Sequence, residues 1–208
     1  QSLPSDRGGC SAWAWEDYVS MHGLSDSPGR QPGIAGIILA AGGSSRFGAV
    51  KQLLPWGRGT CLEACVRTAE LAGLDPIVVV LGFQNELILN QTQLGHAQVV
   101  KNAEWDQGQG ASLKAGVGVL LEGLFGAVFM LADQPQISVN LVMAIKELAW
   151  KRNSVVVPLI NDQRANPVFF PSRAFSRLSS IQGDQGGRAL MGEFPTVLLP
   201  WLDEDMAL

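Results

Sequence analysis

Short apolar runs alternate with longer amphipathic segments along most of this chain, from Gly33 onward. The apolar runs predict buried strands at Ile34–Leu39, Ile77–Leu81, Ala97–Lys101, Ala127–Ala132, Ser154–Leu159 and Val168–Phe170. The segments between them predict helices at Thr60–Ala72, Gln84–Leu94, Ala111–Leu121, Asn140–Lys151 and Arg173–Leu178, with a further one near Gly186–Met191. Continuously apolar strands that alternate with helices are typical of a parallel sheet covered on both faces, so the pattern predicts an α/β fold.

Residues 1–32 have a different texture. They are rich in Gly, Pro, Ser and Asp, and they show one aromatic cluster, Trp13, Trp15 and Tyr18, without sustained periodicity. This composition predicts a tail or linker. With 208 residues, the chain then has room for one domain over residues 33–208.

Composition narrows the class of partner. Hydrophobic residues make up 47% of the chain and charged residues 16%, enough apolar surface for a packed core. The net charge of -4 argues against a general affinity for nucleic acid or an anionic membrane. No apolar run reaches the length of a membrane span, and the first residues do not resemble a signal peptide. Small molecules and proteins are therefore the expected partners.

The three cysteines, Cys10, Cys61 and Cys65, are too few for a disulfide scaffold, and they predict a reducing compartment, the cytoplasm. Cys61 and Cys65 lie four residues apart on one predicted helix face. Joint metal binding is one interpretation, but two buried thiols are favoured because free cysteine is among the most buried residue types.

The first predicted strand runs into a loop of small residues, L-A-A-G-G-S-S at positions 39–45, followed by Arg46 and Lys51. Parallel sheets bind ligands at the carboxyl ends of their strands, where small residues let backbone N–H groups approach a phosphate or a base. Two nearby cations favour a polyphosphate ligand. The loop is not a P-loop, because Ala49 stands where that motif needs lysine, and no G-x-G-x-x-G follows the strand. A glycine-rich turn with two solvated cations is the alternative.

Two later strands also end in polar residues. Asp133 follows the run V-F-M-L-A, so its charge lies in the ligand crevice and needs a cation or strong donors. Mg²⁺ that bridges nucleotide phosphates commonly takes one or two carboxylates. Asn102 follows the strand at 97–101 and can hydrogen-bond a nucleotide, and residues 108–112 open a helix whose amides favour an anion. The alternatives are that Asp133 and Ser112 cap helices and that Trp105 is a packing residue.

Together these segments resemble a known family. L-A-A-G at 39–42, Arg46, Gly48, Lys51 and L-L-P at 53–55 look like the nucleotide-binding signature of the MobA-like nucleotidyltransferases. The segments that begin at Asn102 and Ser112, L-A-D-Q-P at 131–135, N-P-V-F-F at 166–170 and G-D-Q-G-G-R at 183–188 also resemble this family. Within it, the chain is most similar to the molybdenum cofactor cytidylyltransferase branch. Many relatives continue past the last strand into an acidic segment that this sequence lacks, so the C-terminal end of the domain is not defined by the resemblance.

The resemblance implies a Rossmann-like three-layer α/β/α sandwich with a mostly parallel sheet, of the nucleotide-diphospho-sugar transferase type, and it implies roles for individual residues. Arg46, Lys51 and Asp133 would be catalytic, and Asp133 would bind Mg²⁺, with Asp184 as a second ligand. Asn166 and Arg188 would contact the acceptor. The residues that would bind the nucleotide are Leu39, Ala40, Ala41, Gly42, Arg46, Lys51, Asn102, Ser112 and Asp133. Without the family, Asp184 is an N-cap for the helix that follows.

The sequence therefore predicts a Mg²⁺-dependent nucleotidyltransferase that releases pyrophosphate. By resemblance, the donor is CTP and the acceptor is molybdopterin that carries molybdenum, and a protein that receives the finished cofactor would be a further partner. Ala41 stands where guanylyltransferase relatives carry a second glycine, which favours CTP over GTP. One alternative keeps the chemistry with GTP or another small phosphate acceptor. The other is a nucleotide or cofactor carrier without catalysis.

Overall fold

The computed structural model describes residues 32–43 and 50–202, which form an α/β domain around one large sheet. The eight-stranded sheet has the order β10-β7-β9-β6-β1-β4-β5, and β8 pairs with β7. Its strands are β1 Ile34–Ala40, β4 Ile77–Leu81, β5 Gln98–Lys101, β6 Gly126–Leu131, β7 Val155–Ile160, β8 Gln163–Arg164, β9 Val168–Pro171 and β10 Thr196–Pro200. Strands β2, Pro55–Trp56, and β3, Gly59–Thr60, form a separate hairpin.

The sheet is mostly parallel. β1 pairs in parallel with β4 and β6, β4 pairs in parallel with β5, and β10 pairs in parallel with β7. Only β8 and β9 run the other way among the strands described for this sheet, and β9 lies between β6 and β7. The carboxyl ends of β1, β4, β5 and β6 therefore lie along one edge, where a ligand site is expected.

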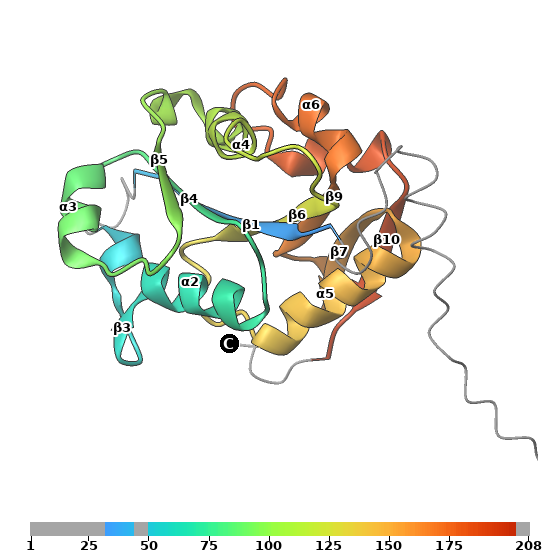
Figure 1. Ribbon diagram of the computed structural model, residues 1–208, viewed down its shortest axis with the longest axis horizontal. Coiled ribbons are helices and arrows are strands. Elements are labelled where there is room, and N and C mark those ends of the chain that lie inside the picture. Colours follow the sequence, from blue (N-terminus) through green and yellow to red (C-terminus); the bar gives the residue numbers. More distant parts are fainter. Residues whose placement is uncertain (1–31, 44–49, 203–208) are drawn as a thin grey trace, which may run out of the picture. The chain divides into compact units, whose positions relative to one another are not determined.

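Helices cover both faces of this sheet, which makes three layers (Figure 1). In the view of Figure 1, α4 and α6 lie above the sheet and α2 and α5 lie below it. The helices are α2 Cys61–Leu71, α3 Asn85–Gln91, α4 Gln109–Val117, α5 Val139–Arg152 and α6 Phe175–Leu178, and the 3-10 turns are η1 Lys51–Leu53, η2 Trp105–Gln107, η3 Ser172–Ala174 and η4 Gly187–Gly192.

The central strands are apolar because both of their faces are covered. Ile37 and Ile38, neighbours in β1, are both fully buried, although their side chains point to opposite faces. On the α4 face, a Cβ on Gly116 would lie 2.8 Å from Ile37 Cγ2, so the glycine lets α4 pack closely onto β1. This close packing fixes the start of α4 relative to the end of β1, where the site lies.

The predicted fold class and all six predicted strands are confirmed, with ends shifted by at most one residue. Several details differ from the predictions. The helix predicted at 111–121 spans Gln109–Val117, and the short strands β2, β3 and β8 were not predicted. The segment at 186–191 forms a 3-10 helix, the segment at 173–178 is divided between η3 and α6, and β10 was not predicted. Thr196–Pro200 escaped prediction because it is an edge strand with only partial burial.

Further predictions concern the two cysteines of α2, membrane spans and the N-terminal tail. Cys61 and Cys65 are free, buried thiols on α2, as the favoured interpretation states. Among the described residues, no helix is long and apolar enough to cross a membrane. Apart from Pro32, the predicted tail at 1–32 lies outside the described residues.

Candidate functional site

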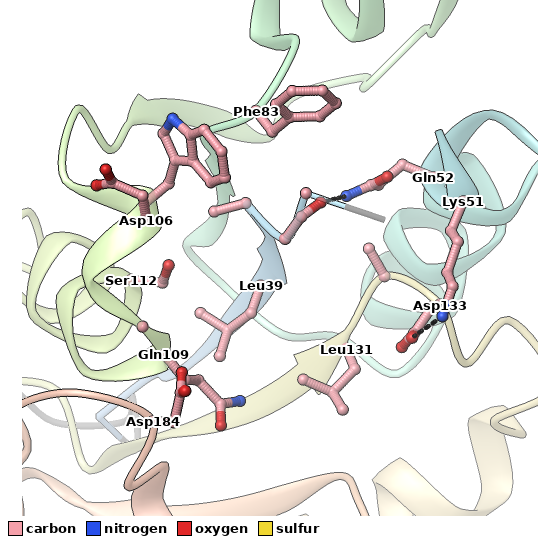
Figure 2. A pocket seen from close by; sticks show the side chains of 16 residues that line it. Leu39, Lys51, Gln52, Phe83, Asp106, Gln109, Ser112, Leu131, Asp133 and Asp184 are labelled. Atoms are coloured by element: carbon pink, nitrogen blue, oxygen red, sulfur yellow. Dashed lines mark hydrogen bonds and ion pairs between the residues drawn. The ribbon is translucent and has the colours of Figure 1, made fainter. Parts of the chain in front are cut away.

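A cavity of about 820 Å³ lies at the carboxyl ends of the parallel strands. Residues from the ends of β1, β4 and β6, from η1 and η2, and from the start of α4 line it (Figure 2). Its lining consists of Leu39, Ala41, Gly42, Gly43, Lys51, Gln52, Phe83, Trp105, Asp106, Gly108, Gln109, Ser112, Leu131, Ala132, Asp133 and Asp184. Most of the predicted nucleotide-binding residues thus meet at one place.

The loop after β1 forms one wall of the cavity. Leu39, Ala41 and Gly42 line it, whereas Ala40 is buried within β1 and is not part of the lining. Ala40 contributes through its carbonyl, which accepts a hydrogen bond from Gln52 Nε2 at 2.8 Å. Arg46, predicted to hold the triphosphate, lies outside the described residues.

Lys51 and Asp133 form the charged part of the cavity. η1 carries Lys51 and the loop after β6 carries Asp133, and their Nζ and Oδ2 atoms lie 3.9 Å apart (Figure 2). Both side chains are half-exposed. Asp133 does not cap the next helix, because Ser138 is the N-cap of α5 and its side chain accepts a hydrogen bond from Leu141 N–H. The carboxylate is therefore available to a ligand.

An aromatic pair forms a further wall. Phe83 follows β4 and Trp105 belongs to η2, and their ring centroids lie 5.2 Å apart. Trp105 packs directly on two glycines, since a Cβ on Gly82 would lie 2.4 Å from Trp105 Cβ and one on Gly43 would lie 2.8 Å from its ring. Trp105 is thus a packing residue that also faces the cavity.

Asn102 and Ser112 form a buried polar contact beside the cavity. Asn102 Nδ2 donates to Ser112 Oγ at 3.1 Å, and Asn102 Oδ1 accepts from Glu104 N–H at 3.0 Å. Ser112 lines the cavity and sits inside α4 rather than at its N-cap, which is Gly108. Asn102 does not line the cavity, so the structure places it behind Ser112, where it orients the serine hydroxyl.

The start of α4 packs against the loop that carries Asp184. Gly108 has φ of 99°, and a Cβ there would lie 2.7 Å from Asp184 Oδ1, so both the backbone and the space require glycine. Gly110 N–H donates to Gly183 O at 2.9 Å, which occupies one of the amides predicted to favour an anion. The N-cap interpretation of Asp184 is wrong, because η4 starts after Gly186 and has no side-chain cap.

A second cavity, of about 580 Å³, adjoins the first. The two share Leu39, Gln109, Leu131 and Asp184 in their linings. Both predicted acceptor residues, Asn166 and Arg188, line the second cavity, and apolar side chains such as Phe129, Phe170 and Met191 make up much of the rest. Asn166 and Arg188 also line a third, more polar cavity of about 380 Å³, together with Arg164.

The two thiols lie beneath the Asp133 loop. Cys65 Sγ donates to Leu131 O at 3.5 Å. Burial, together with the neighbouring Cys61 and Asp133, raises the pKa of the Cys65 thiol to about 12. Burial and Asp133 also raise the pKa of Cys61. Both thiols are therefore protonated at neutral pH and serve as packing groups.

Three carboxylates line the first cavity, those of Asp106, Asp133 and Asp184. The last two are the predicted metal ligands, and a pair of carboxylates suits a divalent cation that binds mainly through its substrate. Asp133 lies beside Lys51, and Asp184 lies across the cavity beside Gln109 (Figure 2). No group of three or more metal-ligating side chains occurs among the described residues. Carboxylate oxygens fit Mg²⁺, which keeps several waters and takes one or two carboxylates alongside phosphates. A closed site made by protein alone does not fit.

Sequence reasoning missed several lining residues, including Gln52, Phe83, Asp106 and Gln109. Phe83 follows the end of β4, so the rule that directed attention to Asn102 and Asp133 would also have found it. Gln52 gave no such signal, because its importance depends on which carbonyls its amide reaches in the folded chain.

A family model for the MobA-like NTP transferase domain matches residues 36–197. The chain is 32% identical over 172 residues to the purine catabolism protein PucB of Bacillus subtilis, a match that covers 78% of this chain and 82% of PucB. It is 31% identical over 134 residues to the molybdenum cofactor cytidylyltransferase of Escherichia coli, a match that covers 64% of this chain and 67% of that enzyme.

Solved structures agree with these matches. The structure of Rv0371c from Mycobacterium tuberculosis in complex with manganese is 28% identical to this chain, with a TM-score of 0.72. The match covers 81% of this chain and 88% of that one. A protein of the same fold thus takes up a divalent cation.

Proposed function

The chain belongs to the family of MobA-like NTP transferases, and from this premise we propose that it transfers CMP from CTP to a molybdopterin-type acceptor and releases pyrophosphate. The observation that carries the proposal is the Lys51–Asp133 pair at the mouth of a cavity walled by the small residues of the β1 loop. A cation and a carboxylate beside an exposed backbone loop are suited to a nucleoside triphosphate with its metal.

The base and ribose would lie against the β1 loop and the aromatic wall. Ala41 lines the cavity but is buried, and its methyl group would lie 2.9 Å from a Cβ on Gly82. The methyl thus packs toward Gly82. Support for cytosine over guanine comes from the residue type, because Ala41 stands where guanylyltransferase relatives carry a second glycine. Ser112, held by Asn102, offers a hydroxyl from the opposite wall.

Asp133 would hold Mg²⁺ together with the phosphates, and Asp184 would be a second carboxylate for it. When bound, the cation would neutralise charge on the α-phosphate and on the leaving pyrophosphate. Lys51 serves the same purpose from the protein, because its ammonium lies beside Asp133 and needs no proton transfer to act. Arg46 would add a second cation.

In the transfer, an oxygen of the acceptor phosphate forms a bond to the α-phosphorus as the bond from that phosphorus to the bridging oxygen breaks. The electron pair of the broken bond leaves with pyrophosphate. An acceptor phosphate is already ionised at neutral pH, so no general base is required. This agrees with the lining of the first cavity, which contains no histidine among its described residues.

The second cavity would hold the acceptor. It adjoins the first at Leu39, Leu131 and Asp184, so an acceptor phosphate at this junction would face the α-phosphate. Its apolar side chains suit a planar ring system, and the Asn166 amide and Arg188 guanidinium suit polar edges or a further anionic group.

The test is pyrophosphate release by the purified protein with Mg²⁺ and each of CTP, GTP, ATP and UTP, with and without molybdopterin that carries molybdenum. We expect release with CTP plus this acceptor only. Release with GTP plus acceptor would replace the proposed donor and keep the chemistry. If a nucleotide binds and no combination releases pyrophosphate, the proposal fails and the protein is a carrier.

A further inference from the structure

Gln52 is the one described side chain with a buried polar atom that lacks a hydrogen-bond partner. Its side chain is 5% exposed, and Oε1 accepts no hydrogen bond from any described residue. Its Nε2, by contrast, donates to two carbonyls of the β1 loop, Ala40 O at 2.8 Å and Gly42 O at 3.2 Å. A buried acceptor without a hydrogen-bond partner destabilises the fold. An apolar side chain of similar size would avoid that cost.

The carbonyl before these two and the one between them also accept hydrogen bonds. Leu39 O accepts from Ala132 N–H at 3.1 Å, and Ala41 O accepts from Phe83 N–H at 3.2 Å. Four successive carbonyls of the loop, at residues 39–42, are therefore tied to donors from the loops after β4 and β6 and from η1. Of these donors only the Gln52 amide is a side chain, and it alone holds two of the four.

This pattern determines where the loop amides point. In a planar trans peptide, the C=O of one residue and the N–H of the next point in opposite directions. Because Gln52 holds the carbonyls of Ala40 and Gly42, the N–H groups of Ala41 and Gly43 point away from Gln52. Ala41 and Gly43 both line the first cavity, so a ligand pressed against this loop meets oriented donors.

Gln52 also joins the loop to the charged pair. It follows Lys51 in the same 3-10 turn, whose backbone is closed by Leu53 N–H to Val50 O at 2.9 Å and Leu54 N–H to Lys51 O at 3.1 Å. Because the Gln52 side chain hydrogen-bonds the β1 loop from this turn, it limits how far the Lys51 turn can move from the loop.

We propose that Gln52 is a positioning residue for nucleotide binding: its amide sets the orientation of the loop at residues 40–43 and ties the Lys51 turn to it. The inference rests on the proposed function as far as the ligand is a nucleotide. The inference predicts that Gln52 affects nucleotide binding more than it affects the stability of the fold. The reason is that the hydrogen bonds donated by its amide are offset by the buried Oε1, which has no partner.

The test compares Gln52→Met, which fills the same space without donors, with Gln52→Glu, which keeps the shape and replaces the donor by an oxygen. Gln98→Met, on the exposed surface of β5, is the matched control. For Gln52→Met we expect an unchanged or higher melting temperature and a Kd for CTP with Mg²⁺, by calorimetry, that is higher by about tenfold. Gln52→Glu should weaken binding at least as much, and the control should leave Kd unchanged.

Hydrogen–deuterium exchange of the ligand-free protein gives a second readout, since Gln52→Met should speed exchange of the amides at residues 40–43. Unchanged Kd and unchanged exchange in Gln52→Met would overturn the inference, because a space-filling role is all that methionine preserves. If Gln52→Met does not fold, Gln52→Leu takes its place. A wild-type protein that binds no nucleotide would reject the proposed function, while the exchange experiment would still decide the role of Gln52.

Discussion

At the scale of single residues, the charged groups of the site contribute little to the stability of the fold. Lys51 and Asp133 lie 3.9 Å apart and are 38% and 47% exposed. An ion pair this exposed contributes between zero and about 1 kcal/mol, because water screens it. Activity and stability are therefore expected to respond differently when either charge is removed.

We predict that Asp133→Asn and Lys51→Met each lower the rate of pyrophosphate release by about 100-fold or more, since each removes a charge that faces the triphosphate. Their melting temperatures should stay within about 2 °C of wild type. Glu147→Gln, which removes one partner of the exposed Lys151–Glu147 pair on α5, is the control and should keep full activity. Full activity in Asp133→Asn would contradict the proposed metal role.

At this scale, the sequence predicted those residues whose charge stands out next to the end of an apolar strand. Asp133 ends a strongly apolar strand, and Lys51 follows a glycine-rich loop, so both could be located without coordinates. Gln52 could not, because two carbonyls ten and twelve residues earlier in the chain give it its role. The placement of Asn102 behind Ser112 is likewise a property of packing.

At the scale of elements, a capping box fixes the start of α2. The sequence pattern T-x-x-E at residues 60–63 is typical of such a box. Thr60 Oγ accepts from Glu63 N–H at 3.2 Å, and Glu63 Oε2 accepts from Thr60 N–H at 2.8 Å. Glu63 Oε1 also accepts from Gln93 N–H at 2.9 Å, which ties the end of α3 to α2. This box sets where Cys61 and the helix begin beneath the site.

The pKa of Glu63 follows from these contacts. Burial alone would raise it, but the hydrogen bonds from Gln93 and Thr60 and the nearby Arg67 outweigh burial and lower it below 4.5. A carboxyl group whose pKa is lower in the folded state stabilises the fold above its unfolded value and loses that effect as the pH falls through the folded value.

We therefore predict that Glu63→Gln lowers the free energy of unfolding by about 1 kcal/mol at pH 7, and that the difference from wild type shrinks below about pH 4. Chemical denaturation at pH 7, 5 and 3.5 measures it. A difference that is the same at all three values would show that the charge of Glu63 plays no part. Glu122→Gln, on an exposed turn, is a suitable control.

Elements with strong periodicity were predicted well, and those decided by pairing were not. The buried strands and α5 follow from their apolar patterns, with boundaries close to the observed ones. The direction of β9 did not follow from its sequence, because V-F-F-P is equally apolar whichever way it runs. Its antiparallel place depends on the connection after β7, which folds back through β8 before β9 enters the sheet.

At the scale of the whole domain, the reversed strand explains why two cavities meet. β9 runs against its neighbours, so its start, next to Asn166, lies at the same edge of the sheet as the ends of β1 and β6. The second cavity is therefore built beside the first, with Leu39, Leu131 and Asp184 at the boundary. A parallel strand in that place would carry its opposite end to this edge.

The two-cavity arrangement makes one further prediction about the intact protein, namely that nucleotide binding stabilises it in the absence of any acceptor. CTP with Mg²⁺ at 100 times its Kd should add about 2.7 kcal/mol to the free energy of unfolding, which for a domain of this size raises the melting temperature by about 5–10 °C.

Chelation of the metal with EDTA should remove much of this shift, since Asp133 would then face the phosphates without a divalent cation. GTP at the same concentration should shift the temperature less, because Ala41 stands where guanylyltransferase relatives carry a second glycine. Equal shifts from all four nucleotides would mean that the site reads the triphosphate and not the base, and the specificity would then have to come from the acceptor cavity.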